Sequence, residues 1–286
     1  MTQCTDRCKR QISFPETIDE LFRLQQQHPD AHLMAGGTDL LVALRHGPQD
    51  TRATICLERI DELRRIDELD DGSVSIGAIA TFSTIARNAL LQERYPLLTQ
   101  AAATVGGPAI RTMASIGGNI VTASPAADSL PALYLLDAQL ELRSAAGSRT
   151  VAIAEFILGP RRTMLQPGEI VSRIILPPFT GWSIQRFEKV GRRKSLAIAV
   201  ASLAAALQLA ADGTVAAARF AWGSVGPTVL RCAEAEQALI GKPLSEETLN
   251  AAALLTQQAV QPIDDIRATA DYRLSVAGNL LLRLAA

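Results

Sequence analysis

Two glycine pairs followed by small polar residues constrain this 286-residue chain more than any other feature. The first lies in Gly36-Gly37-Thr38-Asp39 and the second in Gly117-Gly118-Asn119. Glycine adopts positive φ and lets the backbone approach a ligand closely. Amide groups of such loops, and the helix starts that follow them, attract anions. The pattern therefore suits a pyrophosphate, with polar side chains at Thr38, Ser115 and Asn119 for additional hydrogen bonds.

The alternative interpretation is that each glycine pair is an ordinary tight turn, and for either loop alone it stays open. The glycines do not form a G-x-G-x-x-G motif and do not open a βαβ unit, so a Rossmann site is not indicated. Gly241-Lys242 lacks the upstream glycine of a nucleotide-binding P-loop. A pyrophosphate site here would be of another type.

Composition excludes several classes of function. Lys and Arg total 28 against 29 Asp and Glu, a net charge of −1, and aromatic residues make up 4%. A protein devoted to nucleic acid would carry a basic field or aromatic platforms. With only three His, a hydrolytic site built on several imidazoles is not expected. The chemistry is expected to come from a cofactor or a partner.

Cysteines and hydrophobic segments point to a reduced, non-membrane setting. Four Cys in a chain of this length do not make a disulfide scaffold. Cys56 and Cys232 are predicted to be reduced core residues, whereas Cys4 and Cys8 lie in a polar N-terminal stretch without a predicted role. No signal peptide is visible, and the longest apolar run, residues 196–211, is too short for a membrane span. We predict a cytoplasmic protein.

The pattern of elements predicts an α+β protein of two domains, residues 1–178 and 179–286, with the linker at residues 177–181, Pro177-Pro178-Phe-Thr-Gly181. In the first domain, Asp128 is expected to cap a helix and residues 151–157 are expected to form a strand. In the second, residues 195–211 and 214–224 are predicted to be two long strands joined at Asp212-Gly213, although the alanines leave the first of them ambiguous with a helix. Helices are predicted to follow.

Five motifs, in order along the chain, resemble the FAD-binding subunit of the molybdenum hydroxylases, the family of xanthine dehydrogenase and aerobic carbon monoxide dehydrogenase. They are residues 33–41, 115–128, 168–171, 187–194 and 264–273. The resemblance covers the chain from about Phe14. It implies a two-lobed FAD-binding domain of the vanillyl-alcohol-oxidase type, split near residues 55–65, and a C-terminal domain with a three-stranded antiparallel sheet and helices.

The resemblance also implies which residues touch FAD. By motif match, they are Leu33, Met34, Ala35, Gly36, Gly37, Thr38, Asp39 and Leu40 in the first loop, Ser115, Ile116, Gly117, Gly118 and Asn119 in the second, and Thr122, Asp128, Val105, Val171 and Lys189. The position of Val105 is aromatic in some relatives, so the aliphatic side chain here departs from a ring-stacking pattern. Lys189 is alternatively a solvated member of the basic cluster at residues 192–194, which itself is expected at the surface or against a partner. No catalytic acid–base residue and no metal site are expected in this chain.

The resemblance implies a function in electron transfer. A large molybdopterin subunit would hydroxylate the substrate, a small subunit would carry two [2Fe-2S] clusters, and FAD on this chain would pass electrons to NAD or another acceptor. The alternatives are a stand-alone flavin oxidoreductase of the same fold and a non-catalytic assembly protein. The substrate of the complex is not indicated by this chain.

Overall fold

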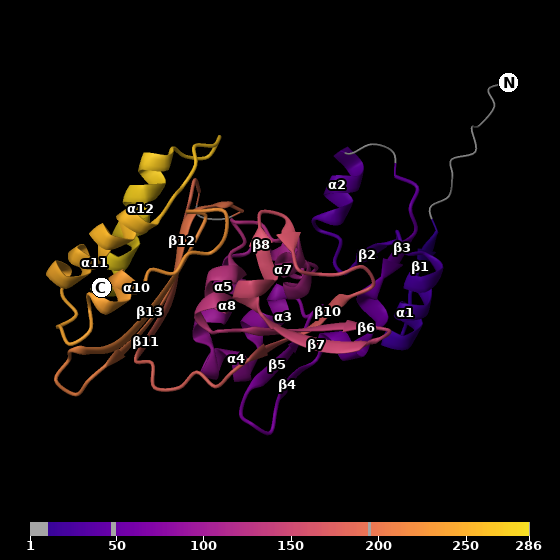
Figure 1. The fold of residues 1–286 in the computed structure, drawn as a ribbon, viewed down its shortest axis with the longest axis horizontal. Coiled ribbons are helices and arrows are strands. Elements are labelled where there is room, and N and C mark those ends of the chain that lie inside the picture. The colour runs from indigo at the N-terminus through magenta and orange to yellow at the C-terminus, as the bar shows by residue number, and fades with distance from the viewer. Residues whose placement is uncertain (1–10, 47–49, 194–195, 286) are drawn as a thin grey trace.

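The computed structural model describes residues 11–46, 50–193 and 196–285 (Figure 1). The first lobe holds a small parallel sheet of order β1-β3-β2. Its elements are β1 (Ile12–Ser13), α1 (Ile18–Gln27), β2 (His32–Met34), α2 (Leu40–His46) and β3 (Thr54–Cys56). Thr17 caps α1 by accepting the Glu20 amide at 3.2 Å. The buried face of α1 packs on Ile55, Ile60 and Leu63 in a small core that also includes Ile79 and Ile170 from the second lobe.

The second lobe is built on an antiparallel sheet of order β4-β5-β10-β6-β7. These strands are β4 (Ile66–Glu68), β5 (Val74–Gly77), β6 (Gln139–Ser144), β7 (Gly147–Ala152) and β10 (Ile170–Leu176). The helices that join or cover them are α3 (Phe82–Arg87), α4 (Ala89–Arg94), α5 (Pro96–Thr104), α6 (Pro108–Arg111), α7 (Ile116–Thr122), α8 (Ser129–Leu135) and α9 (Ile153–Phe156). A hairpin of β8 (Ile157–Gly159) and β9 (Arg162–Thr163) completes the lobe.

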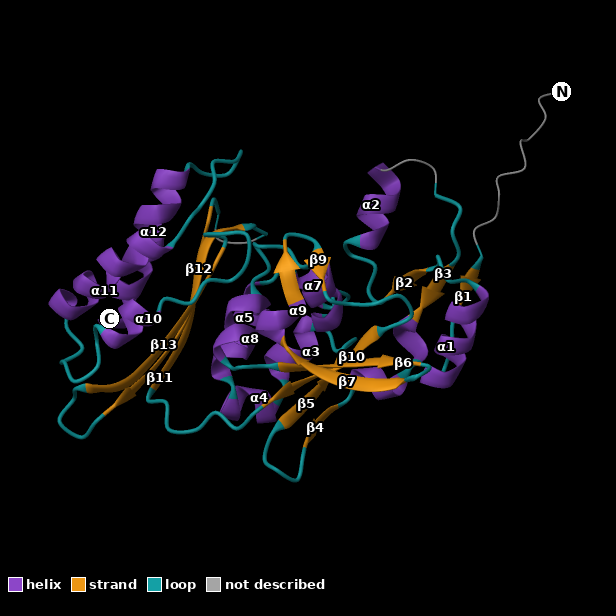
Figure 2. Ribbon diagram, in the orientation of Figure 1, coloured by secondary structure: helices purple, strands orange, loops and turns teal. Residues whose placement is uncertain are grey.

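The C-terminal unit is a three-stranded antiparallel sheet with its own helices on one face and helices of the second lobe on the other (Figure 2). Its elements are β11 (Ile184–Gly191), β12 (Ala199–Leu209), β13 (Val215–Gly223), α10 (Ala233–Gln237), α11 (Glu246–Ala259) and α12 (Ala270–Leu282). One face of β12, with Ala204 and Ala206, packs into the core of the second lobe beside α8, and the neighbouring strand β11 lies against α5. The other face, with Leu203 and Leu207, packs under the C-terminal helices. The unit is thus anchored to the second lobe through apolar contact.

The predicted fold class, α+β with a C-terminal three-stranded antiparallel sheet, is confirmed. Within the segment predicted over residues 195–211, Ala199–Leu209 form strand β12 and not a helix, and residue 195 lies outside the described residues. Cys56 and Cys232 are free and buried. The prediction of one strand over residues 151–157 is wrong, because β7 ends at Ala152 and the turn of α9 follows it. Ile153 and Phe156 are both buried, so the apolar pair at helical spacing, i and i+3, determines the local structure.

Candidate functional site

The first glycine loop connects β2 to α2 and exposes its amides. Gly37 has φ +68°, in the left-handed region that favours glycine. The carbonyls of Gly37 and Asp39 accept the first amides of α2, from Leu41 and Ala43, at 3.0 Å each. Within the described ranges, the backbone hydrogen bonds leave the amides of residues 36–39 without a backbone acceptor. This loop therefore offers several N–H groups to a ligand.

Gly36 fixes the distance between the two loops. A Cβ at this position would lie 1.7 Å from the carbonyl oxygen of Met113, in the segment that leads into the second loop. Because the obstacle is backbone, any side chain at Gly36 would push the segments apart. Thr122, at the end of α7, donates its hydroxyl to Asp39 Oδ2 at 3.2 Å and joins the loops on another side. The first loop is thus held against the second by close backbone packing and one polar contact.

The second loop uses its amides inside the protein. The amides of Ile116 and Gly117 donate to the carbonyls of Ala80 and Ala78, at 3.1 and 2.7 Å. The Gly118 and Asn119 amides donate to the hydroxyl and the carbonyl of Ser115, the N-cap of α7. The expected nest of free amides is therefore found only in the first loop. The second loop contributes shape and the side chains of Ser115 and Asn119, the latter held by the Ser129 hydroxyl at 2.6 Å.

A cavity of about 1060 Å³ lies between these loops and the C-terminal unit. That exceeds most small-molecule pockets, which span about 300–1,000 Å³. Most of the predicted cofactor contacts line it, namely Leu33, Met34, Ala35, Gly36, Gly37, Thr38, Asp39, Leu40, Val105, Ser115, Gly118, Asn119, Thr122 and Asp128. The two glycine loops, about 80 residues apart in the sequence, thus line one cavity.

Four of the predicted residues do not line this cavity. Ile116 and Gly117 are buried, and a Cβ on Gly117 would lie 2.7 Å from Ala78, so these two anchor α7 to the sheet. Val171 is buried on β10 opposite Leu142. Lys189, on β11, reaches the cavity only through its partner Asp128.

Asp128 and Lys189 form a buried ion pair. Asp128 Oδ2 lies 2.6 Å from Lys189 Nζ, and the two side chains are 8% and 10% exposed. Lys189 Nζ also donates to the Thr104 carbonyl at 3.0 Å. Burial raises the pKa of the Asp128 carboxyl to about 6, against the opposing effect of the Lys189 ammonium. The expectation that Asp128 caps α8 is wrong, because its side chain accepts no capping hydrogen bond and faces Lys189 instead.

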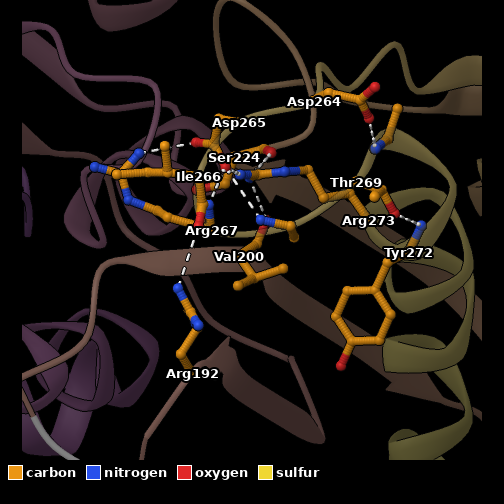
Figure 3. Close-up of polar contacts among 12 residues, drawn as sticks. Arg192, Val200, Ser224, Asp264, Asp265, Ile266, Arg267, Thr269, Tyr272 and Arg273 are labelled. Atoms are coloured by element: carbon orange, nitrogen blue, oxygen red, sulfur yellow. Dashed lines mark hydrogen bonds and ion pairs between the residues drawn. The ribbon is translucent and has the colours of Figure 1, made fainter.

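The sequence prediction missed the wall that the C-terminal unit contributes. Residues 196–199, Ser224, Asp265, Arg267 and Arg273 line the cavity. Asp265 accepts hydrogen bonds from Arg273 Nη2 at 2.7 Å and from Arg267 Nη1 at 2.8 Å (Figure 3). Burial acts to raise the pKa of the Asp265 carboxyl, but these hydrogen bonds and two from the Arg267 and Ala268 amides hold it well below its usual range. The sequence indicates residues 264–273 as a family motif, but only the fold shows that this motif lines the cavity.

Three buried polar atoms on the cavity-lining residues test the fit of a polar cofactor. Asp128 Oδ1, Ser224 Oγ and Arg273 Nε have no hydrogen-bond partner among the described residues. Buried polar groups in proteins are normally paired, so such atoms in one cavity suit a ligand that completes them. A cavity of this volume, with free amides at one loop and unpaired polar atoms on other lining residues, fits a dinucleotide such as FAD.

Two further observations concern the described part of the chain only. None of its helices combines the length and the apolar character needed to cross a membrane. No group of three or more His, Cys, Asp or Glu is arranged to hold a metal ion within it. Cys4 and Cys8 lie outside the described residues.

Comparison with known proteins identifies the family. Residues 8–179 match the model of the FAD-binding domain in molybdopterin dehydrogenase, and residues 186–286 match the C-terminal domain of the CO dehydrogenase flavoprotein. The chain is 34% identical over 259 residues to the xanthine dehydrogenase FAD-binding subunit of Escherichia coli O157:H7, covering 90% of this chain and 88% of the relative. It is 34% identical over 274 residues to the carbon monoxide dehydrogenase medium chain of Hydrogenophaga pseudoflava, covering 94% and 93%.

A solved structure agrees with these relatives. Quinoline 2-oxidoreductase from Pseudomonas putida 86 matches 97% of this chain and 95% of its own chain, with a TM-score of 0.91 and 28% sequence identity. Family models and relatives both cover nearly the whole length, across both lobes and the C-terminal unit. The chain belongs to the FAD-binding medium subunits of the molybdenum hydroxylase family, the oxidoreductases related to xanthine and carbon monoxide dehydrogenases.

Proposed function

We propose that this chain holds FAD in the cavity between its glycine loops and its C-terminal unit and serves as the electron-transfer subunit of a molybdenum hydroxylase. The small partner subunit would carry [2Fe-2S] clusters and the large one the molybdenum cofactor and the substrate pocket. Electrons would pass from the clusters through FAD to NAD or another acceptor. The observation that carries the proposal is the convergence of both glycine loops on one cavity large enough for a dinucleotide.

The residues of the first lobe would bind the pyrophosphate. The free amides of residues 36–39 would offer partial positive charge to an anion, as loop amides and helix N-termini do. A chain of net charge −1 has no overall positive field that could do this instead. Ser115, Asn119 and Thr122 would add side-chain hydrogen bonds. FAD, once bound, supplies the redox chemistry, while the protein contributes orientation and electrostatics.

The other predicted contacts would act at the edges of the cofactor. Asp128, fixed by Lys189, presents an unpaired oxygen that can accept a hydrogen bond from a hydroxyl or an N–H of FAD. Val105 lines the cavity with an apolar surface. We retain Ile116, Gly117 and Val171 as the support of the second loop and of β10.

A visible absorption spectrum of the purified chain, alone and co-expressed with the two candidate partner subunits, tests the proposal. Flavin bands in either preparation, with release of FAD on denaturation, are expected. Their absence in both preparations, even after addition of FAD, would falsify the proposal.

A stand-alone flavin oxidoreductase remains the second candidate, because Asp128 is a carboxyl of raised pKa that lines the cavity and could act as an acid or base. Its pairing with Lys189 at 2.6 Å favours a positioning role instead. Affinity purification of the tagged chain from its own host separates the two. Recovery of a complex with iron–sulfur and molybdopterin subunits supports electron transfer, whereas a free chain that turns over a substrate supports the second candidate.

A further inference from the structure

Ser224 holds an unfavourable backbone conformation at the edge of the cavity. It follows β13 and has φ +64°, in the left-handed region that a serine rarely adopts. Its amide donates to the Pro125 carbonyl at 3.0 Å, and its carbonyl accepts Arg273 Nη1 at 3.1 Å. The residue is therefore clamped between the second lobe and helix α12, which keeps the strained conformation in place.

The hydroxyl of Ser224 has no partner although it is buried. Ser224 is 8% exposed, and its Oγ makes no hydrogen bond with any described residue. The backbone around it uses the amide and carbonyl but leaves the side chain unused. Strain and an unsatisfied hydroxyl at one residue are two unfavourable features that a purely structural role does not explain.

Arg273, whose side chain bonds the Ser224 carbonyl, is also buried and also has an unpaired polar atom (Figure 3). It is 4% exposed, and its Nη1 donates to the Val200 and Ser224 carbonyls at 2.7 and 3.1 Å. Its Nη2 donates to Asp265 at 2.7 Å, whereas its Nε has no partner among the described residues. Both Ser224 and Arg273 line the cavity. A serine hydroxyl can donate or accept a hydrogen bond, whereas an arginine Nε–H can only donate. A single ligand atom that satisfies both groups must therefore be an acceptor.

The charge near the pair favours an electron-rich acceptor. Arg267 and Arg273 carry two positive charges against the single carboxylate of Asp265 to which both are bound. This wall therefore has an excess positive charge, and it lines the same cavity as the first glycine loop. Hydrogen bonds from a charged donor are stronger than those between neutral groups.

We propose that Ser224 and Arg273 form a second FAD-binding wall, in which the Ser224 hydroxyl and the Arg273 Nε–H donate to an oxygen of the cofactor. The inference rests on the proposed function, since it assigns the C-terminal unit a direct part in holding the same FAD. The oxygen belongs either to a flavin carbonyl or to the phosphate and sugar chain, which offer the same acceptor chemistry.

The test uses Ser224→Ala and Ser224→Gly in the full chain, prepared with its partner subunits. Both variants remove the hydroxyl, but glycine also relieves the positive φ, so the apoprotein of Ser224→Gly is expected to be at least as stable as the wild type. Ser275→Ala is the matched control, because that serine is exposed and bonds only the Asp271 carbonyl within α12. Arg273 is left intact because its substitution would also break the buried ion pair with Asp265, which would mix a loss of stability with a loss of FAD affinity.

FAD affinity is measured by titration of the apoprotein, together with the visible spectrum and the midpoint potential of the reconstituted protein. We expect both Ser224 variants to bind FAD about threefold to tenfold more weakly, the loss of one hydrogen bond, and Ser275→Ala to match the wild type. A shifted potential would place the contact on a flavin carbonyl, and an unchanged potential with weaker affinity would place it on the phosphate and sugar chain.

Two different results would refute the second FAD-binding wall and the proposed function, respectively. If the wild type binds FAD and both Ser224 variants bind it equally well with the same potential, the second wall is refuted and the proposed function stands. If the wild type itself binds no FAD, the proposed function fails, and the wall fails with it.

Discussion

Lys189 Nζ lies 2.6 Å from Asp128 Oδ2, so a salt bridge joins β11 of the C-terminal unit to the start of α8 in the second lobe. Both side chains are at least nine-tenths buried. Removal of one partner from a buried pair leaves an uncompensated charge, which costs about 3–5 kcal/mol, whereas removal of both often costs little. The pair therefore couples the two parts of the protein, and the coupling can be measured without the cofactor.

A double-mutant cycle on this pair is the first test. We expect Lys189→Met to lower the free energy of unfolding of the apoprotein by about 3 kcal/mol or more, and Lys189→Met combined with Asp128→Asn to recover most of that loss. Urea unfolding of the four proteins gives the coupling energy. Additive effects of the two substitutions would show that the residues do not interact.

The same carboxyl predicts a pH dependence. Burial raises the pKa of Asp128 from 3.8 to about 6, so between these values the folded state binds more protons on this group than the unfolded chain does. The group therefore destabilises the folded protein as the pH rises through that window. The free energy of unfolding of the wild type, relative to Asp128→Asn, should fall by a few kcal/mol between about pH 4 and pH 6 and level off above.

Unfolding measurements across that range check the sign, and carboxyls common to both proteins cancel in the difference. A difference that stays constant, or that rises with pH, would contradict the raised pKa of Asp128.

The sequence predicted which segments meet at the cavity but not every wall of it. The glycine loops could be predicted because a glycine pair and a neighbouring N-cap residue are local signals, as at Gly37 and at Ser115. Strand β12 was ambiguous because both of its faces are buried, Ala204 toward the second lobe and Leu203 toward the C-terminal helices, so the period-2 alternation of polar residues is missing.

The rest of the site depends on tertiary contacts that leave no local pattern. Ser224 adopts positive φ because Pro125 and Arg273 hold its backbone from two distant parts of the chain. The sequence around Asp128 looks like a helix cap, yet Lys189, 61 residues away, takes that side chain. The amides of Ile116 and Gly117 looked available for an anion until the fold placed Ala78 and Ala80 beside them.

Gly37 provides a test of the first loop that separates strain from binding. Gly37→Ala places a side chain at φ +68°, with its Cβ about 3 Å from Leu41 and Met34, and Gly168→Ala imposes a similar φ of +80° with no atom within 4 Å. Each is expected to cost about 1 kcal/mol of stability. Only Gly37→Ala should lose FAD, because Gly37 lines the cavity and Gly168 does not.

The ratio of bound flavin to protein after gel filtration provides the measurement, with thermal unfolding of both apoproteins as the check on strain. Equal retention of FAD in the two variants would remove the first loop from the binding site.

Asp265 provides the last test, of the segment that carries the cavity wall in the C-terminal unit. Its carboxylate binds the buried guanidinium of Arg273, which is 5% exposed, and that of Arg267. Asp265→Asn leaves Arg273 without a countercharge and is expected to cost about 3 kcal/mol. Asp264→Asn is the matched control, because Asp264 is exposed and its Oδ1 accepts only the Ala270 amide at 2.5 Å, which an asparagine oxygen can still do.

The lowered pKa of Asp265 determines how this difference changes with pH. A carboxyl whose pKa is depressed on folding stabilises the protein above the unfolded value near 3.8, and the contribution disappears as the pH falls through the folded value. In urea unfolding, the gap between the wild type and Asp265→Asn should therefore be full at pH 7 and shrink once the pH is taken below about 4. A gap that is the same for Asp264→Asn and Asp265→Asn at pH 7 would show that the ion pair with Arg273 does not hold this wall.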